Sequence, residues 1–420
     1  MRLITEKVNI GSGSLVIGGG SPIVVQTMCN THTDDVEGTL AQCRRMVAAG
    51  AEMIRITVPG LQDVPHIREI RERLRAEGIM VPIVADIHFS AQTAIEVARF
   101  VDKVRINPGN FHKDHQMART KFLQLLEVCK AHGTAIRIGI NHGSLGEYIT
   151  NLYGNTPQAM AEAAMEWVRM CVQADFRKVV ISLKSSNTAS MVQGYRALVQ
   201  MMKAEGVVFP LHVGVTEAGG GDSGRIKSCV GIATLLEEGI GDTVRVSLTE
   251  DPVNELPVAR YLAARYSSAP MPQLPERELK MLDAACTWGP KLLRHEVDSI
   301  EEEMEPYLRD EIMQAARRRF YKPEYIACPG CGRTMYDLQK AYREVMEKTA
   351  CFKDIVIAIM GCIVNGPGEM ADADWGYVGE GGGKVSIYKK NVPVLRHVPE
   401  DEAPDRLVAL IREDLKAQGK

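Results

Sequence analysis

The sequence lacks any strong excess of charge of one sign. Its 420 residues include 50 Lys and Arg against 53 Asp and Glu, which gives a formal net charge of -3. This balance gives no global reason to expect nucleic acid or an acidic membrane surface as a partner. A site for an anion must therefore come from a local group of basic residues. The chain is long enough for two or three domains with a large apolar core.

The sequence also lacks the marks of export and membrane insertion. Its first residues, MRLITEKVNIGSGSLVIGGG, carry scattered charges and have no apolar core or cleavage site of a secretory signal. No stretch approaches the roughly 18 uninterrupted apolar residues of a membrane span. We therefore expect a cytoplasmic protein. In that reducing compartment its ten cysteines are expected to be buried thiols or metal ligands rather than disulfides.

One sequence unit recurs eight times from about residue 23 to residue 250. Each unit begins with a short β-branched run, continues with a polar or glycine-containing segment, and ends in a stretch with helical periodicity. Apolar strands that alternate with helices indicate parallel strands buried on both faces. Eight such units predict an α/β fold of the (β/α)8 TIM-barrel type, with an open doubly wound sheet as the alternative. Before the first unit, KVNI and SLVI flank GSGS, which predicts a hairpin that closes the N-terminal end of the barrel.

The composition changes after the eighth unit. The stretch SSAPMPQLPE is typical of a linker, and the charged segments EVDSIEEEMEP and RDEIMQAARRRF predict a solvated helical pair. A smaller α/β domain follows, with two cysteine-containing segments, a glycine-rich hairpin and a closing helix. We predict a barrel with its hairpin over residues 1–266, a charged helical insert over 267–320 and a second domain over 321–420.

Four of the predicted strands carry an arginine flanked by isoleucine or valine. Burying a guanidinium without a partner costs several kcal/mol, so four of them near one axis need acidic partners or an anionic ligand. Asp86 and Glu217 are too few to neutralise them together with Lys184. The remaining charge predicts a polyanionic ligand, with phosphate or diphosphate as the natural match for forked donors. These arginines are Arg55, Arg105, Arg137 and Arg245.

The alternative is that each arginine extends outward between helices. The position of the neighbouring polar segments favours an inward orientation. Barrel enzymes have their sites at the C-terminal face, where the segments NHGS (residues 141–144) and KSSN (residues 184–187) leave the fifth and sixth predicted strands. Small polar residues there expose backbone N–H groups, which can bind phosphate.

Three cysteines of the second domain have the spacing of metal ligands. Cys328 and Cys331 form a C-x2-C turn, and Cys362 lies in the glycine-rich segment GCIVNGPGE. Cys351 would complete a four-cysteine zinc site, but it opens the strand-like run CFKDIVIAIM, so we expect a core thiol. An oxygen ligand is then plausible. Glu369 is the nearest candidate, although a glutamate in such a loop is more often exposed at the surface.

Taken together, CPGCGR, GCIVNGPGE, VTEAGGGDSG, INPGN, NHGSL and ISLKSSN resemble the motifs of the 4-hydroxy-3-methylbut-2-en-1-yl diphosphate synthases of the non-mevalonate isoprenoid pathway. They occur in the same order over nearly the whole chain, apart from about residues 267–320. The resemblance implies a barrel followed by a domain similar to those of sulfite and nitrite reductases. It further implies a 4Fe-4S cluster held by Cys328, Cys331, Cys362 and Glu369.

The implied reaction is the two-electron reductive ring opening and dehydration of 2-C-methyl-D-erythritol 2,4-cyclodiphosphate. Glu369 would release its iron to the substrate, and Glu217 is the leading proton donor. The resemblance also implies a homodimer in which the barrel of one subunit faces the cluster of the other. The bacterial-type layout favours flavodoxin over ferredoxin as electron donor. The residues expected to bind the substrate are Arg55, Arg105, Arg137, Asn141, Lys184, Arg245 and Ser247.

The main rival hypothesis is a phosphate-binding barrel transferase that resembles the dihydropteroate synthases and ends in a structural zinc knuckle. It explains the barrel and its basic mouth equally well. It does not explain Glu369 or the absence of a fourth cysteine ligand. A non-catalytic iron-sulfur carrier is a third hypothesis, but it leaves four buried arginines without a role.

Overall fold

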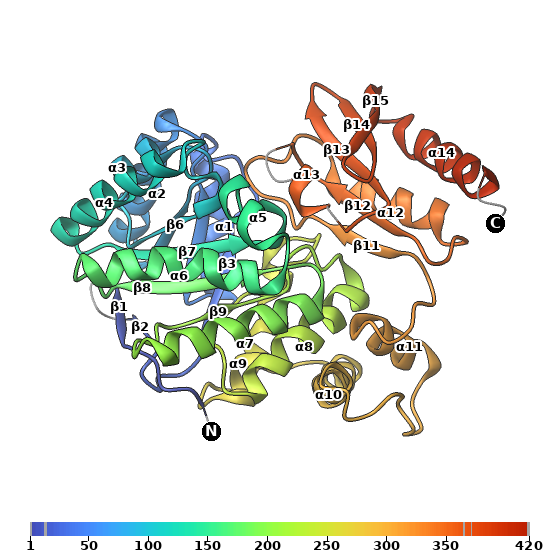
Figure 1. Cartoon of the computed structure of the whole chain (residues 1–420), viewed down its shortest axis with the longest axis horizontal. Helices are drawn as coiled ribbons and strands as arrows, with labels where there is room; N and C mark the ends of the chain where they lie inside the picture. The colour runs from blue at the N-terminus through green and yellow to red at the C-terminus, as the bar shows by residue number, and fades with distance from the viewer. Residues whose placement is uncertain (1, 12–14, 364–365, 371, 418–420) are drawn as a thin grey trace.

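The structure is a computed structural model that describes residues 2–11, 15–363, 366–370 and 372–417. A larger unit holds the N-terminus, and a smaller unit holds the C-terminus (Figure 1). Each unit has a sheet of its own. Among the described residues, no helix is both long and apolar enough to cross a membrane.

Eight parallel strands form the sheet of the larger unit. They pair in the order β8-β7-β6-β5-β4-β3-β10-β9. A parallel bridge between Ile181 of β8 and Leu211, next to β9, joins the two ends of the sheet into a barrel. The predicted (β/α)8 barrel is thus confirmed. Its strands are β3 (Val24–Met28), β4 (Met53–Thr57), β5 (Ile83–Asp86), β6 (Lys103–Ile106), β7 (Ala135–Asn141), β8 (Val179–Lys184), β9 (His212–Val213) and β10 (Thr243–Val244).

Every residue of these strands is buried, because the helices cover the outer face of the barrel while the strands enclose its interior. Short 3-10 turns leave the carboxyl ends of four strands: η1 (Leu61–Asp63), η2 (Pro108–Asn110), η3 (His142–Ser144) and η4 (Pro252–Glu255). The surrounding helices are α1 (Val36–Ala48), α2 (Val64–Ala76), α3 (Ala91–Val97), α4 (His115–His132), α5 (Glu147–Tyr153), α6 (Pro157–Gln173), α7 (Thr188–Ala204), α8 (Gly221–Glu237) and α9 (Leu256–Tyr266).

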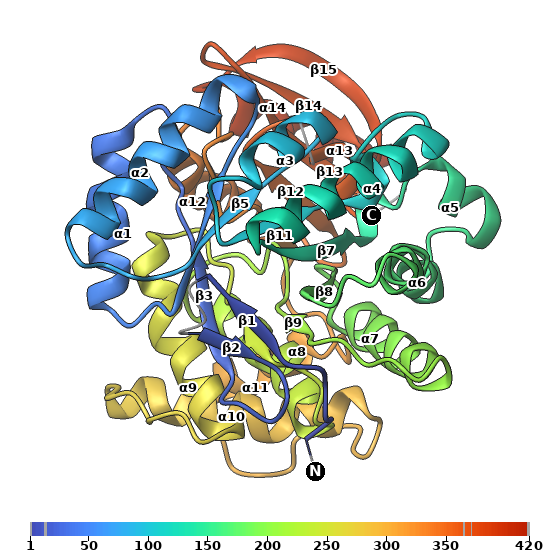
Figure 2. The same ribbon diagram turned by 90° about the vertical axis from the view of Figure 1, so that its left-hand side faces the viewer.

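The predicted N-terminal hairpin is also present. Strands β1 (Val8–Ile10) and β2 (Leu15–Ile17) pair antiparallel, while residues 12–14 at their turn lie outside the described residues. The hairpin lies at the end of the barrel away from the smaller unit (Figures 1 and 2). Its apolar side chains form one buried cluster with the first inward residues of five barrel strands, which are Val24, Met53, Val84, Ala135 and Val180.

The segment after the barrel forms two helices, α10 (Glu276–Leu293) and α11 (Pro306–Ala315). Of the two charged segments predicted to be helical, RDEIMQAARRRF begins within α11, whereas EVDSIEEEMEP forms no helix before Pro306. The prediction that this pair is solvated is wrong. Helix α10 buries one face, including Leu282 and Leu292, in the same core as the barrel. Gly289 lies so close to α8 that a Cβ there would be 2.7 Å from Val230 Cγ2. Most charges of this segment lie on its outer face, whereas Glu311 of α11 is buried.

The smaller unit is a five-stranded mixed sheet in sequence order. Helices α12 (Leu338–Thr349) and α14 (Ala403–Ala417) pack on one face, where Val345 and Leu407 meet Ile357 and Tyr377. A second apolar cluster contains Met360 and Met370, which come before and after the short helix α13 (Gly366–Glu369) in the chain. The strands are β11 (Glu324–Ala327), β12 (Val356–Met360), β13 (Trp375–Gly381), β14 (Lys384–Lys389) and β15 (Val392–Pro399).

The carboxyl end of β11 meets the carboxyl ends of the barrel strands. Ala327 forms a parallel bridge with Ala218, and its N–H donates to the carbonyl oxygen of Glu217 at 3.2 Å. Lys227 of α8 pairs with Glu324 at 3.0 Å. The smaller unit, which carries Cys328, Cys331 and Cys362, therefore covers the mouth of the barrel (Figure 1).

Candidate active site

The barrel mouth holds one cavity into which the predicted residues converge. All four arginines of the isoleucine and valine pattern are buried, Arg137 to 1% exposure, so none of them extends outward between helices. The lining comes from both units of the chain. It comprises Met28, Arg55, Asp86, His88, Arg105, Arg137, Asn141, Lys184, Thr216, Glu217, Arg245, Ser247, Cys328, Pro329, Gly330, Cys331 and Arg333.

Arg105 is held by several acceptors at once. Its Nη2 donates to Asn141 Oδ1 at 2.9 Å and to the carbonyl oxygen of Gly139 at 3.2 Å. Its Nη1 lies 3.3 Å from Asp86 Oδ1 and also contacts the ring of His88. A side chain at position 139 would collide with this guanidinium, since a Cβ would be 2.5 Å from Arg105 Nε. Gly139 therefore makes room for Arg105.

Arg245 has a partner that sequence reasoning missed. Glu255 of η4 accepts hydrogen bonds from Arg245 Nε at 3.3 Å and from Nη2 at 3.2 Å. Arg55 instead donates to the sulfur of Met28, and its Nε is 3.9 Å from Asp86 Oδ1. Arg245 is thus largely neutralised within the barrel, whereas Arg55 is not.

The barrel mouth contains buried polar atoms without a hydrogen-bond partner among the described residues. They include Nε and Nη1 of Arg137, Nε of Arg105 and Oε2 of Glu217. Burial, with the charges of neighbouring arginines, holds the pKa values of Arg137 and Lys184 well below their usual range. An anion bound among these groups would supply acceptors and offset their mutual repulsion. The geometry is therefore that of an anion-binding site.

Glu217 lies at the boundary of the two units. It is 5% exposed, and its backbone has a φ of +53°, a left-handed conformation that residues other than glycine rarely adopt. Burial and the nearby charge of Glu369 raise its pKa well above the usual value. A carboxyl group in this environment retains its proton and can donate it to a ligand in the cavity.

The predicted cluster ligands lie on loops at the mouth. Cys328 and Cys331 are half-buried and Cys362 is buried. Burial raises the pKa of Cys328, and the neighbouring Cys331 raises it further, so the thiol needs a bound cation to become a thiolate ligand. Among the described residues, no three His, Cys, Asp or Glu side chains form a group that could hold a metal ion. Cysteine thiolates are the usual ligands of iron-sulfur clusters, so the chemistry of these three thiols fits such a group.

Glu369 is buried rather than exposed, in contrast to the expectation for a glutamate in such a loop. Its carboxylate accepts a hydrogen bond from Asn141 Nδ2, and burial raises its pKa to about 7. The segment that carries Glu369 packs closely against the turn after β7. A Cβ on Gly143 of that turn would be 2.1 Å from the carbonyl oxygen of Gly368. Asn141 thereby connects Glu369 to Arg105, which joins the predicted ligand to the predicted anion site.

Cys351 is not a core thiol, so that expectation was wrong. It is exposed in the turn after α12, and β12 begins only at Val356. Tyr325, near the start of β11, is hydrogen-bonded to Thr349 at 2.8 Å. This places Cys351 near the start of β11, whereas Cys328 follows its end.

Three titratable residues of the cavity were absent from the sequence-based list of site residues. Asp86 and His88 both belong to the segment ADIH, and His88 Nε2 lies 3.6 Å from Asp86 Oδ2. Burial lowers the pKa of His88 to about 3, so its ring is neutral. Arg333 belongs to CPGCGR and reaches Asp86 from the other unit. Only Arg333 lies in one of the motifs that carried the family resemblance, and only the packing of the two units shows the contacts among the three residues.

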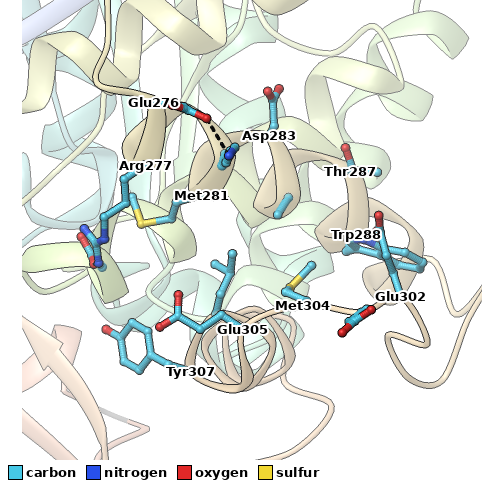
Figure 3. A pocket seen from close by; sticks show the side chains of 15 residues that line it. Glu276, Arg277, Met281, Asp283, Thr287, Trp288, Glu302, Met304, Glu305 and Tyr307 are labelled. Atoms are coloured by element: carbon cyan, nitrogen blue, oxygen red, sulfur yellow. Dashed lines mark hydrogen bonds and ion pairs between the residues drawn. The ribbon is translucent and has the colours of Figure 1, made fainter.

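A larger pocket of about 820 Å³ lies between α10 and residues 302–308 (Figure 3). Its lining is mainly acidic, and two of its carboxylates form ion pairs with its two basic residues. Glu276 pairs with Lys280 at 2.7 Å and Asp222 with Arg277 at 2.6 Å. Trp288 donates to Glu302 at 2.9 Å. This pocket lacks the buried arginines and the cysteines of the barrel mouth, which we therefore take as the active site.

The fold and the site define a two-domain α/β-barrel enzyme with a basic cavity beneath a cysteine-bearing domain. A model described as the GcpE TIM-barrel domain matches residues 5–260, and one described as the GcpE protein C-terminal domain matches residues 324–413. The chain therefore belongs to the GcpE family of 4-hydroxy-3-methylbut-2-en-1-yl diphosphate synthases, which confirms the resemblance found in the sequence.

Two relatives illustrate the match. The 4-hydroxy-3-methylbut-2-en-1-yl diphosphate synthase (ferredoxin) of Synechococcus sp. (strain CC9311) is 41% identical and aligns with 98% of this chain and 95% of its own length. The flavodoxin enzyme of Phocaeicola vulgatus is 33% identical over 98% of each chain. The solved dihydropteroate synthase of Burkholderia cenocepacia aligns at 14% identity over 63% of this chain and 99% of its own, with a TM-score of 0.40, which supports no functional argument.

Proposed function

We propose that the chain catalyses the two-electron reductive ring opening and dehydration of 2-C-methyl-D-erythritol 2,4-cyclodiphosphate to 4-hydroxy-3-methylbut-2-enyl diphosphate. The single observation that carries this proposal is the set of buried guanidinium nitrogens, without partners among the described residues, in a cavity that is also lined by Cys328 and Cys331. Arginines match the phosphate oxygens, and the cysteines match a redox cofactor. The relatives named above support the same activity.

The proposed substrate-binding groups surround the cavity on several strands. Arg137 of β7 has two N–H donors without a partner among the described residues. Arg105 lies opposite it on the neighbouring strand β6, and Arg55 lies on β4. Lys184, Asn141, Arg245 and Ser247 complete the proposed set. These fixed positive charges would also stabilise the diphosphate oxygens as negative charge develops when the C–O bond breaks.

Cys328, Cys331, Cys362 and Glu369 would hold a 4Fe-4S cluster, which would supply electrons one at a time when bound. A flavodoxin or a ferredoxin is the proposed donor to it. Glu217 is proposed to donate the proton that lets the hydroxyl group leave as water, because its carboxyl is buried and has a raised pKa. Its Oε2 has no hydrogen-bond partner among the described residues, so it is available to a ligand.

The direct test is an assay of anaerobically purified protein with the cyclic diphosphate and a reduced donor. The protein is expected to be brown, to contain about four iron and four sulfide per chain, and to form the linear diphosphate. Colourless protein with one zinc per chain and no turnover would contradict the proposal and favour the barrel transferase hypothesis.

We also propose that two chains form a homodimer by exchanging their C-terminal domains. The barrel and the smaller domain have separate cores, and the contacts at the mouth each join a residue of one domain to a residue of the other. A domain of the partner subunit can make the same contacts. Such an exchange would place each active site between subunits.

Mixing two inactive variants tests this exchange. Glu217→Gln disables the barrel side, and Cys362→Ser disables the cluster side. If the domains are exchanged, co-expressed variants should regain about a quarter of the wild-type activity, since half of the dimers are mixed and each mixed dimer has one intact site. No recovery in a preparation shown to contain mixed dimers would mean that each chain closes on its own barrel.

A further inference from the structure

Arg333 reaches from the C-terminal domain into the barrel mouth. It is 8% exposed. Its Nη2 donates to the carbonyl oxygen of Asp86 at 3.1 Å, and its Nη1 lies 3.5 Å from Asp86 Oδ2. The same Nη1 lies 4.0 Å from Cys331 Sγ. One side chain thus contacts both a proposed cluster ligand and the end of barrel strand β5.

The loop before Arg333 is fitted closely to the barrel. A Cβ on Gly332 would lie 2.7 Å from the carbonyl oxygen of Thr31, which follows β3. Only glycine allows this approach without a shift of the backbone. The position of Arg333 therefore depends on close packing of the C-terminal domain on the barrel mouth. We call this close packing the seating of the domain.

Asp86 is shared among more cationic and donor groups than one carboxylate can bind well. Besides Arg333 it faces Arg105 Nη1 at 3.3 Å, His88 Nε2 at 3.6 Å and Arg55 Nε at 3.9 Å. Burial alone would raise the pKa of Asp86, but the charges of Arg55 and Arg105 outweigh it and hold the pKa well below its usual value. The carboxylate is therefore charged, and its neighbours compete for it.

A bound anion would change this competition. Oxygens of a diphosphate would engage Arg55 and Arg105, which are the groups that now share Asp86. Asp86 would then be more available to Arg333. Binding in the barrel would thereby strengthen a contact that only the C-terminal domain can make.

We propose that Arg333 is a positioning residue that couples anion binding at the barrel mouth to the seating of the C-terminal domain, through Asp86. The proposal rests on the proposed function for the identity of the anion. It assigns Arg333 no contact with the substrate. The contact with Cys331 means that seating also fixes the position of a proposed cluster ligand.

The experiment measures hydrogen exchange of the segment 328–333 in the anaerobic holoenzyme, with inorganic diphosphate as the probe. In the wild type, diphosphate should slow exchange of this segment by about tenfold or more. Arg333→Met should lose this slowing, and because coupling is reciprocal its Kd for diphosphate should rise by no more than about the same factor of ten. Arg333→Lys should recover part of the slowing, because the lysine ammonium keeps the positive charge but lacks the paired N–H donors of the guanidinium.

Two further variants make the result interpretable. Arg343→Met makes the same change at an exposed site of α12 and should behave as the wild type. Asp86→Asn removes the shared charge from the other side of the contact and should also abolish the slowing. Unchanged slowing in Arg333→Met, or loss of diphosphate binding in that variant, would overturn the coupling role.

Turnover separates this proposal from the proposed function. Arg333→Met should lower kcat by about tenfold or more and change KM by less than about threefold. A wild-type kcat in this variant would overturn the role of Arg333 alone. If the wild type itself fails to convert the cyclic diphosphate, the proposed function fails, and the exchange experiment with inorganic diphosphate still decides the role of Arg333.

Discussion

Replacing Cys362 by serine is expected to lower turnover by at least about a thousandfold. The protein should also lose the brown colour expected of a bound iron-sulfur cluster. Cys362 is buried in a loop at the barrel mouth, and the proposed cluster has three thiol ligands. A hydroxyl group is a poor substitute for a thiolate at iron. The iron content should fall from about four to less than about one per chain, as measured by a colorimetric assay and by the visible spectrum.

Cys351→Ser is the matched control for this substitution. Cys351 is exposed and lies near the start of β11, whereas the three proposed ligands lie at the mouth. This variant should retain iron, colour and activity. A Cys362→Ser protein that keeps four irons and normal turnover would remove Cys362 from the ligand set.

Replacing Glu217 by glutamine is expected to lower kcat by about a hundredfold to a thousandfold. Glutamine has nearly the same shape and keeps a hydrogen-bond donor, but it cannot release a proton to the departing hydroxyl group. The residue does not belong to the arginine set that is proposed to bind the diphosphate, so KM should change much less than kcat. Single-turnover kinetics with the pre-reduced enzyme measures the effect on the chemical step.

Two controls accompany the Glu217 variant. Iron content and the visible spectrum should match the wild type, which excludes loss of the cluster as the cause. Glu147→Gln changes an exposed carboxylate at the start of α5 and should leave kcat unaltered. Unchanged turnover in Glu217→Gln with intact iron would require another proton donor.

Much of the fold could be predicted because its signals are local. A β-branched run followed by a stretch with helical periodicity can be recognised without knowledge of distant residues. Each of the eight predicted runs forms a strand of the barrel. The arginines could be placed inside the barrel for a similar reason. Each sits in an otherwise apolar strand, and strand geometry fixes which side chains share its face.

The errors concern residues whose environment is set by distant parts of the chain. Glu255 pairs with Arg245 because η4 turns back over the barrel mouth, and nothing in its local sequence indicates this contact. Helix α10 was expected to be solvated because its segment is rich in charge. Its apolar face packs on α8, a partner that composition does not reveal. Cys351 was assigned to a strand that begins five residues later.

The N-terminal hairpin has a consequence for how often the enzyme can turn over. Together with the first inward residues of five strands, it fills the end of the barrel away from the C-terminal domain with apolar side chains. In the part of the chain that the structure describes, the barrel interior is therefore sealed at that end, and the C-terminal domain lies across the other. A ligand of the basic cavity must therefore enter and leave at the mouth, between the barrel and the C-terminal domain. The loops at that boundary can limit how fast product is released, and so limit kcat.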